Sequence, residues 1–319
     1  MSRRVLVTGA GGFVGANLVQ AALSLNNSVV ALVRPQTDTW RLIQTPAKLE
    51  RVDLLDMDAL QQVIHAFQPN LIIHSATHGG YPNQKDQTRI AQTNYLTAFN
   101  LLNAMLKVCP SATLLNLGSS SEYGTKHEPM KETDLLEPNS LYGASKAAAT
   151  LLTRAFALEH GLQTFSIRLF SPYGAWEDPN RLIISAIQKA LEHHDFPMTS
   201  GVQGRDFIFI DDVSRILLST DFSELPTGAV FNLGSGTETC IFDVVSLIYQ
   251  ITKSRGQVLR GAIPDRQHDS FQSRWQADVS EATKALNWGN LATLEVGIKQ
   301  TSQWLQAYNG RRYSSSLYS

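Results

Sequence analysis

The sequence predicts an α/β protein with a doubly wound parallel sheet and a smaller α/β lobe toward the C-terminus. Short apolar runs typical of buried strands alternate with segments of helical character, and they lie at residues 5–8, 28–33, 49–52, 71–75, 113–117 and 164–168. Repeated strand–helix units imply a parallel sheet covered by helices on both faces. With 319 residues, 43% of them hydrophobic, the chain can bury a large core and a second lobe.

The strand–helix rhythm weakens after about residue 170, where prolines separate shorter elements. We therefore expect a first domain over residues 1–170 and a lobe over residues 171–308, with some segments after residue 205 returning to the first domain. The polar tail, residues 309–319, is expected to be flexible.

Composition excludes several classes of protein. A net charge of -1 gives no general reason to bind nucleic acid. Cys109 and Cys240 are the only cysteines, so neither a disulfide framework nor a thiolate metal site is indicated, and the histidines show no ligand spacing. No apolar run reaches the ~20 residues that span a bilayer, and the N-terminus enters a strand directly. We expect a cytoplasmic protein without a metal.

The first chemical motif joins the first strand to the first helix. Residues 7–17 read VTGAGGFVGAN, with glycines at positions 9, 12 and 15. Missing side chains permit a tight turn and close approach of a pyrophosphate, and the helix N-terminus offers free N–H donors. Dinucleotide binding is favoured over an ordinary glycine-rich turn, and the loop residues expected to contact the cofactor are Gly9, Gly12, Phe13, Val14 and Gly15.

The ends of the next strands bear on the choice of cofactor. The second strand ends at Arg34. If the cofactor were NAD, an acid would be expected at this position, because a carboxylate accepts hydrogen bonds from the ribose hydroxyls. Because a guanidinium suits a 2′-phosphate, NADP is favoured and NAD stays possible, although Arg34 could also simply face solvent. Asp53 either meets the adenine or caps the helix that begins near Asp56; Leu54 and Ala76 complete this set of expected cofactor contacts.

The second motif pairs Tyr142 with Lys146, one helical turn apart, downstream of a strand that runs into GSSSEYG at residues 118–124. The same spacing relates Tyr81 to Lys85, but that pair surrounds a proline in an expected loop and no serine-bearing strand precedes it. A nearby ammonium favours the phenolate of a tyrosine whose usual pKa is about 10. Tyrosine, lysine and a serine hydroxyl together indicate proton transfer coupled to hydride transfer, against the alternative of a buried tyrosine beside a surface lysine.

These motifs together resemble the extended short-chain dehydrogenase/reductases, the nucleotide-sugar epimerase/dehydratase family, over residues 5–304. The resemblance implies a Rossmann-type NAD(P)-binding domain over residues 1–170 and a nucleotide-sugar-binding lobe over 171–308. It implies that Tyr142, Lys146 and Ser119 are catalytic, with Ser120 as the fallback serine, and that Asn94 belongs to the cofactor site. The further substrate contacts that it implies are His78, Ser120, Ser171, Arg181, Arg205 and Arg266.

Departures from the family pattern narrow the reaction. Family dehydratases usually place an Asp-Glu or Ser-Glu pair directly after the catalytic Ser/Thr, whereas this chain has Ser120 and Ser121 there, with Glu122 one residue late. A 4,6-dehydratase is therefore disfavoured, and no Cys/His pair supports a double epimerisation. The remaining candidates are an NADPH-dependent 4-ketoreductase of a CDP- or dTDP-linked 4-keto-6-deoxyhexose, which is favoured, and an NAD-dependent 4-epimerase. A dinucleotide-binding sensor or scaffold is the non-enzymatic alternative.

Two expected helices carry apolar residues on more than one face. They cover residues 87–107 and 141–160. Because relatives pair these helices across a two-fold axis, we expect a homodimer.

Overall fold

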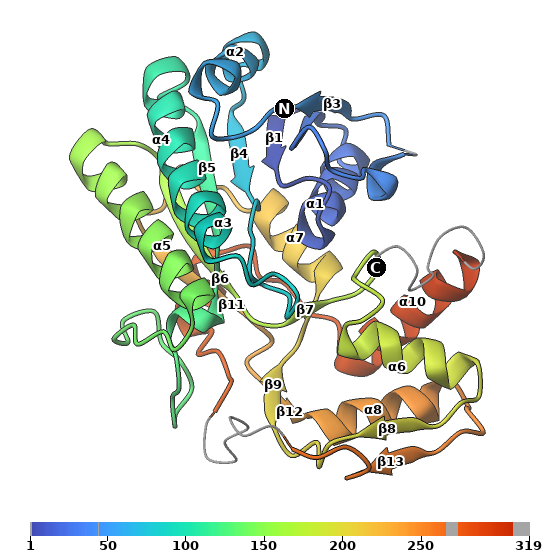
Figure 1. Cartoon of the computed structure of the whole chain (residues 1–319). Coiled ribbons are helices and arrows are strands. Elements are labelled where there is room, and N and C mark those ends of the chain that lie inside the picture. The colour runs from blue at the N-terminus through green and yellow to red at the C-terminus, as the bar shows by residue number, and fades with distance from the viewer. Residues whose placement is uncertain (1, 44, 266–273, 309–319) are drawn as a thin grey trace.

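A seven-stranded parallel sheet organises the chain (Figure 1). The computed structural model describes residues 2–43, 45–265 and 274–308. The strand order is β11-β6-β5-β4-β1-β2-β3, and each neighbouring pair is parallel, which confirms the predicted α/β class. The strands are β1 (Arg4–Thr8), β2 (Ser28–Val33), β3 (Lys48–Arg51), β4 (Leu71–His74), β5 (Thr113–Ser119), β6 (Thr164–Leu169) and β11 (Val230–Leu233).

The side chains of each central strand point alternately into two separate hydrophobic cores, one on each face of the sheet. In β1, Val5 and Val7 face one core while Leu6 faces the other, and all three are fully buried. Successive side chains of a strand point to opposite faces, so a strand covered on both sides is apolar throughout. This explains why the strands appear in the sequence as continuous apolar runs.

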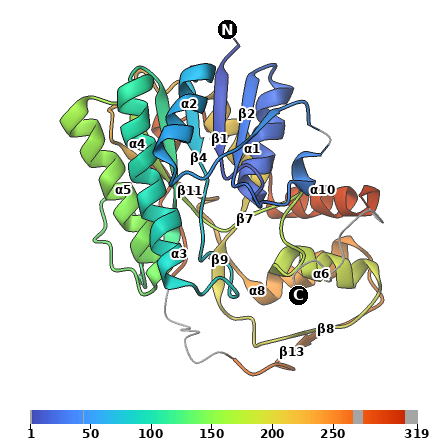
Figure 2. The same ribbon diagram turned by 45° about the horizontal axis from the view of Figure 1, so that its top comes forward.

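Helices cover both faces of the sheet. The helices α2 (Met57–Phe67), α4 (Thr97–Val108) and α5 (Leu141–His160) pack on one face, with α4 and α5 side by side (Figures 1 and 2). On the other face, α1 (Phe13–Ser24) packs against α7 (Ile210–Ser219). Residues far apart in the sequence therefore share one layer.

Two connections differ from the sequence-based expectation. Among the described residues between β2 and β3, the only helical element is a 3-10 turn, η1 (Trp40–Leu42). The expected single helix over residues 87–107 is divided into α3 (Gln87–Ala91), a π-helical segment η2 (Gln92–Leu96) and α4. Such π-helical segments often lie at functional sites.

Among the described residues, the lobe consists of helices and pairs of short strands. The helices α6 (Leu182–Leu191), α8 (Ile241–Ile251) and α10 (Leu294–Ala307) continue the core that lies behind α1 and α7. A further short helix, α9 (Ser280–Ala285), packs against β11 of the sheet. The short strands of the lobe form pairs. These pairs are β7 (Pro172–Tyr173) with β10 (Ile208–Phe209), β8 (Phe196–Met198) with β13 (Val258–Arg260), and β9 (Gly204–Asp206) with β12 (Glu238–Cys240).

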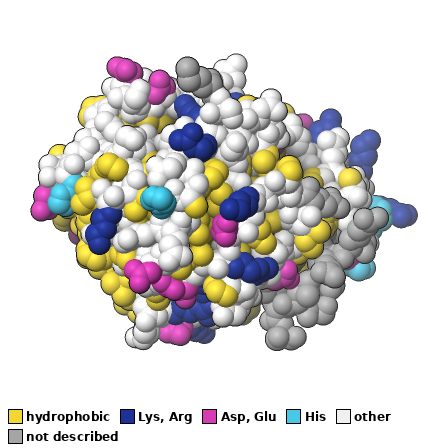
Figure 3. Space-filling model, turned by 90° about the horizontal axis from the view of Figure 1, so that it is seen from above, with side chains coloured by type: hydrophobic (Ala, Val, Ile, Leu, Met, Phe, Trp, Pro, Cys, Tyr) yellow, Lys and Arg dark blue, Asp and Glu magenta, His cyan; other side chains and the backbone are white. Residues whose placement is uncertain are grey.

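Lysines and arginines are interspersed with acidic and apolar side chains on the face seen in Figure 3. That face therefore carries no continuous basic patch. Among the described residues, no helix has the length and apolar character needed to cross a bilayer. The same residues contain no cluster of three His, Cys, Asp or Glu side chains arranged for a metal ion.

Candidate active site

A cavity of about 1630 Å³ opens at the carboxyl ends of the parallel strands. Its walls come from both the sheet domain and the lobe. Typical small-molecule pockets enclose roughly 300–1000 Å³, so this cavity has room for a dinucleotide and a second ligand together. Ligands of open α/β sheets bind at this edge.

The glycine loop forms one end of the cavity. Gly9 has φ +64°, and a Cβ there would lie 2.6 Å from the backbone of Ala76. A Cβ on Gly15 would lie 2.4 Å from the carbonyl oxygen of Gly9. The N-terminus of α1 has no side-chain cap and no acid in its first turn, so its N–H groups are free to bind an anion. All five loop residues predicted to contact the cofactor line the cavity.

Two guanidinium groups face the cavity beyond the loop. Arg34 follows β2, Arg89 lies on α3, and both line the wall together with Asp53 and Leu54. Burial and the neighbouring charge of Arg89 lower the pKa of Arg34, while Asp53 opposes this effect. Within the described part of the chain, neither guanidinium forms an ion pair or hydrogen bond. This end of the cavity therefore suits an additional anionic group.

The capping role considered for Asp53 belongs to Asp56. The Asp56 carboxylate accepts a hydrogen bond of 3.0 Å from the backbone N–H of Ala59 and begins α2. Asp53 accepts one from the N–H of Leu55 at 3.0 Å. Asp53 thus stays at the cavity wall, where an adenine contact is sterically open to it.

Asn94 lies behind the cavity wall. Its side-chain oxygen accepts from the backbone N–H of His78 at 2.8 Å and from the Thr77 hydroxyl at 3.1 Å. Its amide nitrogen donates to the His78 carbonyl and to the Ser145 hydroxyl, both at 2.8 Å. Asn94 therefore ties the loop after β4 to α5, and neither Asn94 nor His78 lines the cavity. Their direct contacts with cofactor and sugar stay predictions.

Tyr142, Lys146 and Ser119 meet in the cavity. The Ser140 hydroxyl caps α5, two residues before Tyr142, and β5 ends at Ser119. Burial raises the pKa of Tyr142, whereas hydrogen bonds with Ser119 and Thr77 favour the phenolate and act against the rise. The structure therefore joins the serine and tyrosine that the sequence pattern paired.

Lys146 is 2% exposed, and burial lowers its pKa to about 8, with the charge of Glu122 opposing the decrease. Among the described residues, its ammonium group forms no ion pair or hydrogen bond, so its donors are available to a ligand. The nearby His74 is buried, and burial together with the Lys146 charge lowers its pKa to about 3. His74 is therefore neutral and adds no positive charge beside Lys146.

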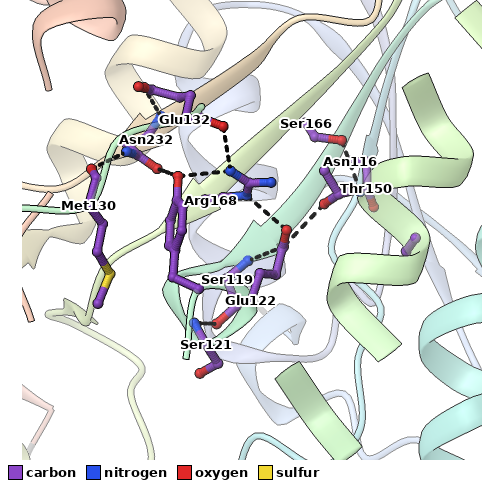
Figure 4. Close-up of polar contacts among 12 residues, drawn as sticks. Asn116, Ser119, Ser121, Glu122, Met130, Glu132, Thr150, Ser166, Arg168 and Asn232 are labelled. Carbon is purple, nitrogen blue, oxygen red and sulfur yellow. Dashed lines mark hydrogen bonds and ion pairs between the residues drawn. The ribbon is translucent and has the colours of Figure 1, made fainter. Parts of the chain in front are cut away.

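The residues after Ser119 divide between cavity and interior. Ser120 and Ser121 line the cavity, and the Ser120 hydroxyl accepts from the indole N–H of Trp275 at 3.1 Å. Glu122 is fully buried and forms an ion pair of 2.8 Å with Arg168 (Figure 4). The acid that follows the serines is thus directed away from the cavity.

The lobe wall holds the remaining predicted substrate contacts. The guanidinium of Arg181 donates to the Gly80 carbonyl at 2.8 Å and lies 4.4 Å from the centre of the Tyr81 ring. The guanidinium of Arg205 lies 5.0 Å from the Trp275 ring centre. These two arginines and Ser171 line the cavity, whereas Arg266 lies outside the described residues.

Tyr81, Glu177 and Trp275 line the cavity, although the sequence analysis assigned them no role in the site. Tyr81 donates a hydrogen bond of 3.3 Å to Glu177, and burial raises the pKa of Glu177 to about 7 although Arg181 lies nearby. Trp275 closes the wall beside Ser120. Tyr81, Glu177 and Trp275 lie far apart in the sequence, so no local spacing connects them. Their residue types, aromatic and acidic, were the only signal available from the sequence.

The model of the NAD dependent epimerase/dehydratase family matches residues 5–234. The chain belongs to this family. The predicted extended short-chain dehydrogenase/reductase family is therefore confirmed, and with it the expectation of an enzyme. A dTDP-glucose 4,6-dehydratase of Neisseria meningitidis is 28% identical, over 95% of this chain and 93% of the relative. UDP-glucuronate 4-epimerase 3 of Arabidopsis thaliana is 26% identical, over 98% of this chain and 79% of the relative.

Solved structures share the fold over nearly the whole chain. MoeE5 in complex with UDP-glucuronic acid and NAD is 27% identical, with a TM-score of 0.82 over 96% of this chain and 99% of that one. UDP-glucose 4-epimerase of Thermotoga maritima has a TM-score of 0.86 over 96% and 99%, and at 22% identity it supports the fold alone. The Rossmann-type architecture is confirmed.

Proposed function

We propose that this protein is an NADPH-dependent 4-ketoreductase that acts on a nucleotide-linked 4-keto-6-deoxyhexose. The observation that carries the proposal is the cavity around Ser119, Tyr142 and Lys146, in which serines occupy the two positions where family dehydratases usually hold Asp-Glu or Ser-Glu. Glu122 cannot replace these acids because it is buried in an ion pair. The cavity therefore has groups for hydride transfer coupled to proton transfer, and directly after Ser119 it lacks the acids that would eliminate water from the sugar.

The proposed roles follow from the geometry of the three residues. NADPH, when bound in this cavity, would supply the hydride for reduction of the carbonyl group. Tyr142 donates the proton to the carbonyl oxygen, and Ser119 shares a hydrogen bond with that oxygen. Lys146 stabilises the resulting phenolate through its positive charge and binds the nicotinamide ribose with its free donors. The protein thus supplies acid, orientation and charge, and the cofactor supplies the electrons.

Arg34 and Arg89 support the choice of NADPH. A 2′-phosphate between them would satisfy two guanidinium groups that otherwise repel each other, and charge-assisted hydrogen bonds to phosphate are strong. NAD remains the alternative because MoeE5 holds NAD and Asp53 offers a carboxylate at the same end of the cavity. The cofactor preference is a direct experimental question.

The lobe arginines are proposed to bind the nucleotide part of the substrate. Arg181 and Arg205 present guanidinium groups to the cavity, which suits a diphosphate. Arg266 is proposed to share this role. Ser120, Ser171 and His78 are proposed as sugar contacts.

A 4-epimerase is the second candidate. MoeE5 binds a UDP-sugar together with NAD, and the catalytic groups of this cavity would also serve reversible oxidation at C4. An epimerase retains its cofactor through the cycle, whereas a reductase releases it, so the nucleotide extracted from purified protein separates the two. Tight NADPH binding without turnover of any nucleotide sugar would favour the sensor or scaffold.

We also propose that the protein is a homodimer formed through α4 and α5. Apolar side chains on these helices and on the preceding segment are exposed, among them Tyr95, Leu96, Phe99, Leu151 and Leu158. Exposed apolar patches of this kind mark interfaces. Sedimentation of the protein and of Leu151→Glu tests this assembly, and an unchanged monomeric mass in both would exclude it.

The deciding assay mixes purified protein with NADPH and, in turn, CDP- and dTDP-4-keto-6-deoxyglucose. Loss of reduced-nicotinamide absorbance that Tyr142→Phe abolishes would support the ketoreductase and identify its nucleotide. No oxidation, together with NAD in the purified protein, would favour the epimerase.

A further inference from the structure

A buried carboxylate lies directly beneath the catalytic residues. Glu122 has no exposed surface, and its Oε1 accepts from the backbone N–H of Ser119 at 2.9 Å and from the Thr150 hydroxyl at 3.1 Å. Its Oε2 accepts from Nε of Arg168 at 2.8 Å (Figure 4). One side chain thereby connects the end of β5, the helix α5 and the strand β6.

The connected elements are those that carry the catalytic groups. Thr150 lies one helical turn beyond Lys146 and two turns beyond Tyr142, on the same side of α5. Ser119 is the last residue of β5. The carboxylate also explains a glycine: a Cβ on Gly118 would lie 2.4 Å from Oε1. The backbone next to Ser119 is therefore shaped to admit the Glu122 carboxylate.

The charges around Glu122 indicate a second role, which is electrostatic and acts on Lys146. Lys146 is buried, and the Glu122 charge acts against the decrease of its pKa. The imidazole of His74, on β4, is neutral, so it cannot act as a second cation. On β6, Arg168 shares the carboxylate and also contacts the Tyr123 hydroxyl at 2.8 Å.

The other acid of this network lies on the far side of Arg168. Arg168 donates to the backbone carbonyl of Glu132 at 3.2 Å, and the Glu132 side chain accepts from the backbone N–H of Asn232 at 2.8 Å. Burial raises the pKa of Glu132. Of these two acids, Glu122 is the one whose charge raises the pKa of Lys146.

We propose that Glu122 is a positioning residue for this active site: its carboxylate fixes Ser119 against α5 and places a buried negative charge beside the face of α5 that carries Tyr142 and Lys146. The proposal rests on the proposed catalytic use of Lys146 and Ser119 for its functional meaning. The positions of the charges themselves do not depend on the identity of the substrate. Arg168 completes the arrangement by holding the carboxylate in place from β6.

The test follows the titration of Lys146 by NMR in the full-length protein labelled with 13C at lysine Cε, with the resonance assigned from its loss in Lys146→Arg. In the unaltered protein we expect a midpoint near pH 8. In Glu122→Gln the lost negative charge should lower this midpoint by about one pH unit. The basic limb of the pH–rate profile should move in the same direction, because activity requires the charged lysine.

Glu132→Gln is the matched control, since it removes an equal charge beyond Arg168 and should leave the Lys146 midpoint unchanged. The double variant Glu122→Gln/Arg168→Gln serves if Glu122→Gln does not fold, because it leaves no unpaired guanidinium behind. It should lower the midpoint by a smaller amount, since the positive charge of Arg168 is lost together with the negative charge of Glu122. An unchanged midpoint in the folded single or double variant would overturn the proposal. The NMR titration needs no substrate, so failure of the reductase assay and failure of this proposal are separate outcomes.

Discussion

The two walls of the cavity are built in different ways. The cofactor wall begins with one continuous turn, residues 9–15, in which backbone groups and missing side chains create the binding surface. The lobe wall brings together Tyr81, Glu177, Arg205 and Trp275 from distant parts of the chain, and it uses charged and aromatic side chains. The first wall follows from local geometry, whereas the second exists only after the lobe has packed against the sheet.

The two tyrosine–lysine pairs give the sharpest comparison between the walls. Tyr142→Phe should lower kcat about 10³-fold, because general acid catalysis contributes roughly 10²–10⁴-fold. Tyr81→Phe should change kcat less than about tenfold, because Tyr81 contacts Glu177 and carries no expected proton transfer. Steady-state hydride transfer measures both. Equal losses in the two variants would contradict the assignment of the catalytic tyrosine.

Glu177 should give the lobe wall a pH-dependent stability. Its pKa is raised from 4.5 to about 7, so the folded protein holds a proton that the unfolded chain has lost in this interval. This contribution to the free energy of unfolding is complete below pH 4.5 and is lost as the pH rises through 7. Between pH 4.5 and pH 7, the free energy of unfolding measured in urea should therefore decrease by about 3 kcal/mol more in the unaltered protein than in Glu177→Gln.

Glu281→Gln is the control for Glu177, since Glu281 forms an exposed ion pair with Lys284. Its stability should follow the same pH dependence as the unaltered protein. A Glu177→Gln protein that also does so would show that Glu177 titrates normally in the folded state.

Gly15→Ala should disturb the cofactor wall through backbone contact alone. The added Cβ would meet the Gly9 carbonyl at 2.4 Å and the Ser75 hydroxyl at 2.7 Å, so the loop must shift. We expect NADPH affinity to fall about 30-fold, equivalent to roughly 2 kcal/mol, in a fluorescence titration. Gly161→Ala is the control: Gly161 has φ +70°, and an added Cβ there would meet nothing within 4 Å, so this variant should lower stability and retain affinity.

The smallest expected effect concerns cofactor choice. Arg34→Ala should reduce the preference for NADP over NAD about tenfold, because one charge-assisted hydrogen bond to the 2′-phosphate is lost. Arg89→Ala should act in the same direction. Competition between 2′,5′-ADP and 5′-AMP measures the preference without substrate, and Arg154→Ala, outside the cavity, controls for loss of net charge. Equal affinities for both ligands in the unaltered protein would exclude a 2′-phosphate site.

Sequence reasoning succeeded where neighbours in sequence are neighbours in space. The six predicted strands match six strands of the sheet to within two residues at either end. Five of them are buried on both faces, whereas β3 is an edge strand with largely exposed side chains. The seventh strand, β11, was not identified because it lies after residue 170, where the alternation of strands and helices weakens in the sequence. The π-helical segment that carries Asn94 also leaves no mark in the apolar pattern.

The sequence by itself determined the class of fold, the glycine loop and the pairing of Tyr142 with Lys146, because strand alternation, loop conformation and helical spacing act over a few residues. Tertiary structure decided the environment of these groups. It buried Glu122 beneath Ser119, opposed two guanidinium groups beyond the loop, and brought Glu177 to Tyr81. Burial and electrostatic contact depend on which distant segments pack together, and no local spacing encodes that information.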